Sequence, residues 1–206
     1  MSQADIRYSH VKNGLCLNRF LRLVVERPRD PAFLAKGWID RLVAPLPPAA
    51  KILDLGCGGG QPIARYLLDR GFAVTGVDAA TSVIELIKTR LSRGRWIKGD
   101  MRTIVIDETF DAVIAWNSLT WLSHGDRALM ARRAAAWLKP EGRMLFNAPA
   151  DLDPSRKDYR DGSPYRVDLE ATNYSTAIAE SDLRLIAHMA VDPTCEDAGI
   201  WLAEKL

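Results

Sequence analysis

The chain of 206 residues contains few cysteines, which limits the chemistry open to it. Cys16, Cys57 and Cys195 are an odd number at wide spacings, and no CxxC pair occurs. The sequence therefore predicts neither a disulfide framework nor a thiolate metal site. Histidine is equally scarce, with three isolated residues and no acidic cluster at ligand spacing, so no metal site is expected.

Charge of one sign is also lacking. Lys and Arg number 28 against 26 Asp and Glu, and the net charge of +2 is too small to predict binding to nucleic acid or to an anionic membrane. No stretch approaches the ~20 apolar residues of a membrane helix, and the first ten residues lack the apolar region of a secretory signal. We therefore expect a cytoplasmic protein that binds neither nucleic acid nor membrane and is a monomer or a homodimer.

What the chain does contain is the composition of an ordinary globular protein, 48% hydrophobic and 26% charged. Residues 1–48 are predicted to be a mostly helical extension or lid, because apolar residues recur there at helical spacing on either side of Pro28. These apolar positions are Leu17, Phe20, Leu21, Val24 and Val25 before the proline, and Leu34, Trp38 and Leu42 after it. The second helix is expected to end before Pro45, and the whole chain is expected to be a single domain with its core in residues 50–206.

From residue 50 onward, short apolar runs alternate with helical stretches. The predicted strands are Ile52–Leu55, Ala73–Val77, Arg95–Lys98, Ala112–Trp116 and Arg143–Ala148, and the predicted helices are Pro62–Arg70, Ser82–Ser92 and Arg127–Leu138. Alternation of this kind is typical of an α/β fold with a parallel sheet that is covered by helices on both faces.

The C-terminal part follows a different pattern. A helix is expected within Asp168–Ser181, followed by strands at Leu183–Val191 and Gly199–Ala203. Because the connection between these two strands is too short for a crossover helix, they should be antiparallel neighbours. The sequence thus predicts a mostly parallel seven-stranded sheet with an antiparallel C-terminal hairpin. Residues 149–167 are polar and are predicted to form a long loop.

The most informative segment is Ile52–Pro62, in which a buried strand enters a glycine-dense turn and then a helix. Glycines allow a sharp turn and a close approach to a ligand, and a helix N-terminus favours an anionic group. A dinucleotide fingerprint would place glycine at position 61, where this chain has Gln61. Asp54 precedes the glycines and would repel a pyrophosphate, so it favours a ligand that is cationic at this point.

At these residues the chain resembles the class I S-adenosylmethionine-dependent methyltransferases of small molecules, over about residues 50–206. The matching segments, in the family's order, are Ile52–Gly60, Gly76–Asp78, Gly99–Met101, Phe110–Trp116 and Leu138–Gly142. The resemblance implies a Rossmann-like three-layer sandwich with S-adenosyl-L-methionine as cofactor. The cofactor contacts expected from it are Asp54, Gly56, Cys57, Gly58, Gly60, Asp78, Ala79, Asp100, Met101, Ala115 and Trp116.

Reasoning from the residue types agrees with the resemblance. Asp78 ends a predicted strand 18 residues after Gly60, close to the ~20 expected of a carboxylate that binds ribose hydroxyls. Asp100 is expected to accept the adenine amino group, and the backbone N–H of Met101 to meet a ring nitrogen. Cys57 lies inside the turn, where a small filler is expected rather than a nucleophile. All these positions follow carboxyl ends of parallel strands, where open α/β sheets bind ligands.

The catalytic group is less well defined. In the family the backbone near Ala115 contacts the cofactor, and related enzymes often carry an acid and a histidine just after it, where this chain has Asn117 and Trp121. Trp116 is expected to be either an aromatic wall for a cation or a core aromatic residue. His124 is either a base or a surface residue. Trp116, Asn117 and His124 are therefore weak catalytic candidates, and His188 is expected to be structural.

We expect transfer of a methyl group to an N, O or S atom of a small-molecule acceptor by in-line displacement, which mainly requires alignment and exclusion of water. Acceptor contacts are expected from residues 1–48 and 149–167, with Tyr8, Arg19, Tyr159 and Tyr165 as candidates. Two alternatives are an NAD-dependent oxidoreductase, which Asp54 and Gln61 disfavour, and a non-catalytic S-adenosylmethionine-binding protein.

Overall fold

The structure is a computed structural model, and it describes residues 33–119, 122, 124–149, 171–196 and 198–206. Contacts between residues divide the chain into two units, Met1–Phe33 and Leu34–Leu206. All elements described below belong to the second unit. Several sequence predictions lie outside the described residues: the helix around residues 17–25, the side chains of Tyr8, Arg19, Trp121, Tyr159 and Tyr165, and nearly all of the loop 149–167.

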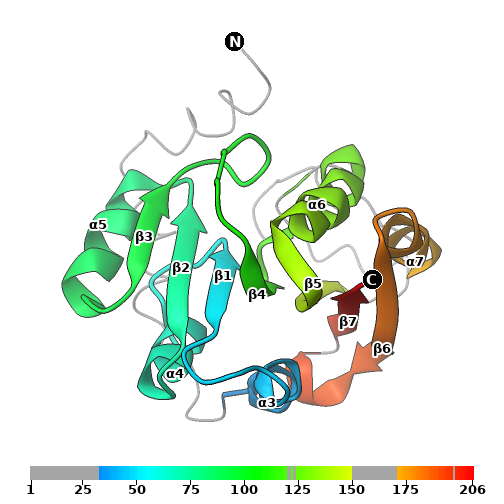
Figure 1. Ribbon diagram of the computed structural model, residues 1–206, viewed down its shortest axis with the longest axis horizontal. Helices are drawn as coiled ribbons and strands as arrows, with labels where there is room; N and C mark the ends of the chain where they lie inside the picture. Colours follow the sequence, from blue (N-terminus) through cyan, green and yellow to red (C-terminus); the bar gives the residue numbers. More distant parts are fainter. Residues whose placement is uncertain (1–32, 120–121, 123, 150–170, 197) are drawn as a thin grey trace. The chain divides into compact units, whose positions relative to one another are not determined.

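In the described part of the second unit, seven strands form one sheet in the order β3-β2-β1-β4-β5-β7-β6 (Figure 1). The strands are β1 (Lys51–Leu55), β2 (Ala73–Asp78), β3 (Arg95–Lys98), β4 (Phe110–Ala115), β5 (Leu138–Pro149), β6 (Leu183–Asp192) and β7 (Ala198–Lys205). Strands β1 to β5 run parallel, whereas β7 is antiparallel to both β5 and β6. The mostly parallel seven-stranded sheet with an antiparallel C-terminal hairpin is therefore confirmed.

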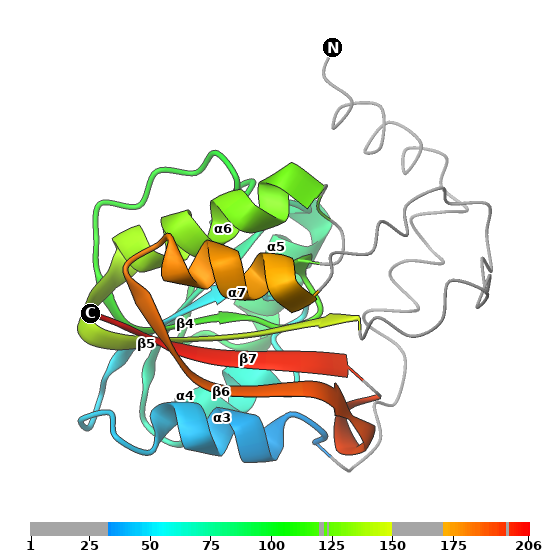
Figure 2. The same cartoon turned by 90° about the vertical axis from the view of Figure 1, so that its right-hand side faces the viewer.

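Helices cover both faces of this sheet. They are α3 (Lys36–Val43), α4 (Ile63–Asp69), α5 (Thr81–Arg90), α6 (His124–Trp137) and α7 (Ala171–Ala179), with a short 3-10 helix η3 (Pro193–Cys195) between β6 and β7. Figure 2 shows α3 and α4 below the sheet and α6 and α7 above it. In the sheet, β2 lies on one side of β1, whereas β5 lies on the opposite side of β4. Because both connections are right-handed crossovers, the helices within them, α4 and α6, lie on opposite faces of the sheet. This is the three-layer α/β sandwich that the sequence predicts.

The core forms because the central strands are apolar on both faces. Ile52, Leu53 and Leu55 of β1 are fully buried, and the cluster between the sheet and the helices above it includes Phe110 and Phe146. A strand that is covered on both sides needs apolar residues at successive positions, which explains the continuous apolar runs in the sequence. The edge strand β6, by contrast, is exposed over most of its length.

Helix α3 packs as part of the sheet unit rather than apart from it. Trp38 and Leu42, which the sequence assigns to an apolar stripe, are buried, and Trp38 Nε1 donates a hydrogen bond of 2.7 Å to Asp192 Oδ2 at the end of β6. The helix begins at Lys36, and it ends at Val43, before Pro45, as expected for its C-terminus. The described part of residues 1–48 thus belongs with the core, while a lid role for the remainder stays a prediction.

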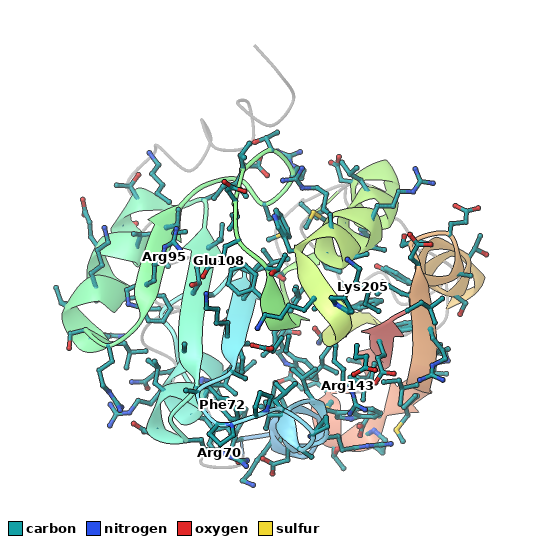
Figure 3. All side chains as sticks on the ribbon, viewed as in Figure 1. Arg70, Phe72, Arg95, Glu108, Arg143 and Lys205 are labelled. Carbon is teal, nitrogen blue, oxygen red and sulfur yellow. The ribbon has the colours of Figure 1, made fainter. Side chains whose placement is uncertain are left out.

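Several charged side chains form ion pairs across the surface. Glu108 accepts hydrogen bonds from both Lys51 and Arg95, at 2.6 and 2.7 Å, and Arg143 pairs with Glu204 at 3.0 Å (Figure 3). Exposed pairs of this kind contribute little stability, but they leave these charges locally balanced. Among the described residues, no helix is long and apolar enough to cross a membrane, and no group of His, Cys, Asp or Glu is placed to hold a metal ion.

Candidate active site

The candidate site lies at the carboxyl ends of β1, β2 and β4, where the order of the sheet reverses direction. Strand β1 pairs with β2 on one side and with β4 on the other. Chain connections leave this point toward opposite edges of the sheet, which opens a crevice above the strand ends in folds of this type. The glycine turn, which follows Leu55, borders this crevice, as do the segments that follow Asp78 and Ala115.

The glycine turn is tied to the end of β2 by its own backbone. The N–H groups of Gly56 and Cys57 both donate to the carbonyl of Val77, at 2.7 and 3.1 Å, and Gly60 N–H closes the turn on Cys57 O at 3.0 Å. Gly56 has φ +77°, and a Cβ atom there would lie 2.4 Å from the Cβ of Ser118. A side chain is therefore excluded by both backbone conformation and space, which explains the glycine at this position.

Asp78 stands where the sequence expects a ribose-binding carboxylate. Its Oδ2 accepts from Gly58 N at 3.1 Å and its Oδ1 from Ala80 N at 2.9 Å. Burial raises the pKa of Asp78, while backbone hydrogen bonds from Ala80, Gly58 and Ala79 act in the opposite direction. Each carboxylate oxygen keeps further acceptor capacity, so the group fits a pair of ligand hydroxyls.

Asp54 is a buried carboxylate that has no hydrogen-bond or ion-pair partner among the described residues, and it is 4% exposed. Burial, followed by the charge of Asp78, raises the pKa of Asp54 to about 7. Burying a charge is costly unless an opposite charge compensates it. The two carboxylates therefore make this end of the crevice suitable for a cationic ligand group and unsuitable for a pyrophosphate.

Cys57 is buried within the turn and has a free thiol. Burial, together with the charges of Asp54 and Asp78, raises the pKa of the thiol above its ordinary value. A thiol held in its neutral form is a poor nucleophile. These surroundings support its interpretation as a small filler.

The sequence predicts that the Asp100 carboxylate accepts a hydrogen bond from adenine, but in the structure this carboxylate already has a partner. Its carboxylate accepts a bidentate interaction from Arg102, with Nη2 at 2.5 Å and Nε at 2.9 Å, and a further bond from the Arg102 backbone N–H at 2.9 Å. Arg102 also reaches Asp126 in the first turn of α6 at 3.2 Å. A direct role of this carboxylate toward adenine would require it to share its oxygens with the guanidinium, whereas the Met101 N–H has no partner among the described residues.

The segment after β4 carries the acceptor-side candidates. Ala115 is fully buried at the end of the strand and Trp116 is half-buried directly after it. Asn117 has φ +53° and forms a reciprocal pair with Asn147 of β5: its N–H donates to Asn147 Oδ1, and its own Oδ1 accepts from Asn147 Nδ2, both at 2.6 Å. Asn117 therefore shapes the backbone, and the structure gives no sign that it acts as an acid or base.

The other candidates are dispersed. His188 lies in β6, as predicted, and its ring stacks on Trp201 at 4.6 Å. His124 begins α6, but its side chain is outside the described part of the structure, as is Trp121. Ser118 and Asn147 received no role from the sequence. The signal for Asn147 was a single amide in the apolar run Met144–Ala148, since a buried polar group normally has a specific partner.

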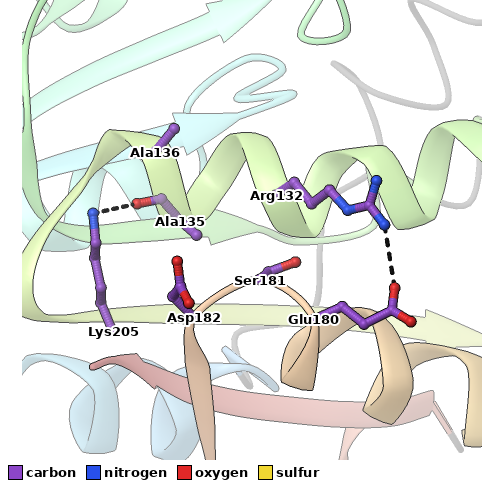
Figure 4. Close-up of a pocket in the computed structure, with 7 residues that line it drawn as sticks. All are labelled: Arg132, Ala135, Ala136, Glu180, Ser181, Asp182 and Lys205. Carbon is purple, nitrogen blue, oxygen red and sulfur yellow. Dashed lines mark hydrogen bonds and ion pairs between the residues drawn. The ribbon is translucent and has the colours of Figure 1, made fainter.

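A cavity of about 240 Å³ lies elsewhere, between α6, α7 and the end of β7 (Figure 4). It is lined by Arg132, Ala135, Ala136, Glu180, Ser181, Asp182 and Lys205. Lys205 Nζ donates to the carbonyls of Ala135 and Leu138 at 2.8 and 2.9 Å, so it satisfies the end of α6. Because Leu138 begins β5, this cavity is at the opposite end of the parallel strands from the glycine turn, and Arg132 of its lining is paired with Glu180 at 3.2 Å.

The region that contains the glycine turn is similar to known methyltransferases. Residues 52–142 match the model of the family described as "Methyltransferase domain". The putative methyltransferase YqeM of Bacillus subtilis is 34% identical over 116 residues, covering 53% of this chain and 47% of the relative. A ubiquinone biosynthesis O-methyltransferase of Bartonella tribocorum is 31% identical over 148 residues, covering 68% and 50%. The chain thus spans about half the length of these curated relatives.

Among solved structures, the fold is similar to that of CalS10, an amino pentose methyltransferase from Micromonospora echinaspora solved with bound S-adenosylmethionine. The TM-score is 0.68 at 22% identity, and the alignment covers 84% of this chain and 90% of the other. At this identity the likeness concerns the fold, and it agrees with the seven-stranded topology described above.

Proposed function

Because residues 52–142 belong to the methyltransferase domain family, we propose that this chain transfers a methyl group from S-adenosylmethionine to an N, O or S atom of a small-molecule acceptor. The observation that carries the proposal is the pair of carboxylates beside the glycine turn. Asp54 is buried and has no partner among the described residues, and Asp78 presents oxygens at the end of the next strand. S-adenosylmethionine carries an ammonium group at its amino acid end and two hydroxyls on its ribose, and this pair of carboxylates matches both groups.

The residues present fit the cofactor in order along the crevice. Asp78 would bind the ribose hydroxyls, the Met101 N–H would meet the adenine ring, and Asp54 with the backbone near Ala115 would hold the amino acid end. Gly56 and Gly58 leave the turn without side chains, so the backbone can approach a ligand closely. When bound, the cofactor supplies a methyl carbon that its positively charged sulfur has already activated.

The protein's own task in such a reaction is alignment. In-line displacement requires that donor and acceptor meet at the right distance and angle with water excluded, so a strong base is needed only for acceptors that must lose a proton. Trp116 is half-buried directly after Ala115, where an aromatic face would border a cation. The Asn117–Asn147 pair would keep this segment in place during the reaction.

Three observations support a small acceptor. The net charge is +2, and the charged side chains described above are largely ion-paired rather than gathered into a basic face. The relatives and structural neighbours include a ubiquinone biosynthesis O-methyltransferase and an amino pentose methyltransferase, and ubiquinone and amino pentoses are small molecules. Residues 1–48 and 149–167 remain the expected source of acceptor contacts, because the motifs above account for the cofactor alone.

The test is turnover of methyl-labelled S-adenosylmethionine with a panel of amines, phenols, thiols and carboxylic acids. An acceptor-dependent labelled product, lost in Asp78→Ala, would support the proposal and exclude a non-catalytic binding protein. Binding of S-adenosylhomocysteine without any product across the panel would favour that alternative. Thermal stabilisation by NAD and none by S-adenosylhomocysteine would instead favour an oxidoreductase and refute the proposal.

A further inference from the structure

Ser118 carries a buried hydroxyl that the fold does not satisfy. The residue follows β4, is 6% exposed, and its Oγ has no hydrogen-bond partner in the described structure. Buried hydroxyls are nearly always paired, and leaving one unpaired destabilises the folded state. The unpaired Ser118 hydroxyl therefore needs an explanation, which its surroundings supply.

The surroundings of Ser118 are the residues of the candidate cofactor site. A Cβ atom built on Gly56 would lie 2.4 Å from Ser118 Cβ, 3.3 Å from its Oγ and 3.4 Å from Met101 Cε. The hydroxyl is therefore in the immediate neighbourhood of the first glycine of the turn and of the side chain that follows Asp100. These segments arrive from three different strands, β1, β3 and β4, and they meet at Ser118.

The backbone beside Ser118 is held in place by a dedicated contact. Asn117 adopts φ +53°, which is unfavourable for most side chains but tolerated by asparagine. The two 2.6 Å hydrogen bonds to the buried amide of Asn147 fix this turn. A buried amide and a residue with left-handed backbone conformation thus hold the Ser118 hydroxyl at a position where the described residues offer it no partner.

We propose that the Ser118 hydroxyl makes a hydrogen bond to bound S-adenosylmethionine, and that Asn147 acts as its positioning residue through Asn117. The inference rests on the proposed function and adds a cofactor contact that neither the motifs nor the resemblance assigns. It accounts for two features together: the unpaired hydroxyl beside the glycine turn, and the amide pair that orients it.

The experiment compares Ser118→Ala with Ser181→Ala. Ser181 is also 6% exposed, but its hydroxyl donates a hydrogen bond to the carbonyl of Ala177. It lines the cavity at the end of the parallel strands that is opposite the glycine turn. Affinity for S-adenosylhomocysteine is measured by calorimetry and the melting temperature without ligand by circular dichroism. Ser118→Ala should weaken binding roughly two- to twelvefold, as expected for one hydrogen bond. It should also raise the melting temperature by about 2–4 °C, since an unsatisfied group is removed. Ser181→Ala should lower the melting temperature and leave binding unchanged.

A purely structural role for Ser118 cannot produce opposite changes in stability and affinity. If wild type binds S-adenosylhomocysteine and Ser118→Ala binds it equally well, the inference is wrong while the proposed function stands. A drop in both melting temperature and affinity would likewise overturn it, because the hydroxyl would then have a partner within the protein. If wild type does not bind the probe at all, the proposed function itself fails, and that result is distinct from the other two.

Discussion

Asp54 gives the sharpest prediction, because its burial makes the stability of the ligand-free protein depend on pH. Moving a carboxyl pKa from 3.8 to about 7 corresponds to about 4 kcal/mol at 1.36 kcal/mol per pH unit. The folded-state pKa is raised, so the stabilising contribution is fully present below pH ~4 and is lost as the pH rises to about 7. Asp54→Asn should remove this dependence and raise the free energy of unfolding at pH 8 by up to about 4 kcal/mol.

Cofactor binding should show the opposite trend. A cationic ligand group favours the ionised carboxylate, and at pH 6 about one Asp54 in ten is ionised if its pKa is about 7. Wild type should therefore bind S-adenosylhomocysteine roughly tenfold more weakly at pH 6 than at pH 8, because affinity falls with the fraction of the competent form. Binding near pH 6.5 should release a proton, which calorimetry in buffers of different ionisation enthalpy detects. Asp54→Asn should bind weakly at both pH values.

The assays are urea unfolding and calorimetry between pH 5 and 8, with Asp111→Asn as the matched control. Burial raises the pKa of Asp111, but hydrogen bonds from Lys139 at 2.7 Å and from the Lys51 N–H outweigh it, so the net pKa is lowered. Its stabilisation is present at neutral pH and lost in acid, so Asp111→Asn should destabilise without affecting binding. Identical pH profiles of unfolding for wild type and Asp54→Asn would refute the reasoning.

Three further predictions concern the same site. Asp78→Ala should weaken S-adenosylhomocysteine binding more than tenfold with an unchanged circular dichroism spectrum; unchanged affinity would mean that the ribose lies elsewhere. Gly56→Ala should abolish binding and lower the melting temperature, because its Cβ would meet Ser118 at 2.4 Å and its φ is +77°; a stable, binding variant would contradict the described turn. Asn147→Ala should reduce the free energy of unfolding in urea by about 1–3 kcal/mol, since it leaves the Asn117 N–H unpaired; no loss would show that the pair is dispensable.

Much of the fold follows from local pattern. Apolar runs such as Ile52–Leu55, separated by glycine and proline, placed most of the described strands and helices within a few residues, and the short connection after Asp192 correctly predicted the antiparallel hairpin. Strand β5 is an exception, because it begins at Leu138, five residues before the predicted Arg143. Boundaries were less certain, because a helix end depends on which backbone groups find partners. Helix α6 begins at His124, three residues before the predicted start, and β4 begins at Phe110 rather than Ala112.

The residues of the candidate site likewise divide into those that local sequence pattern predicted and those that it missed. Motif spacing located Asp54, the glycines and Asp78, since each lies within a few residues of a strand end. Arg102 was missed as the partner of Asp100, although the two are close in sequence, because a side-chain pairing depends on rotamers and on the nearby α6. Ser118 and Asn147 were missed because their roles depend on contacts between strands that are distant along the chain.

The sequence by itself determined the architecture, the glycine turn and the placement of a carboxylate, Asp54, before the glycines, from which we expect a cationic ligand rather than a pyrophosphate. These properties depend on periodicity, on residues without a Cβ, and on the sign of a charge, all of which can be read locally. The tertiary structure alone decided which polar groups have partners: Asp54 and the Ser118 hydroxyl have none in the described structure, whereas Asp100 is held by Arg102. Whether a buried group is satisfied depends on atoms brought together from several strands, and folding is what brings them together.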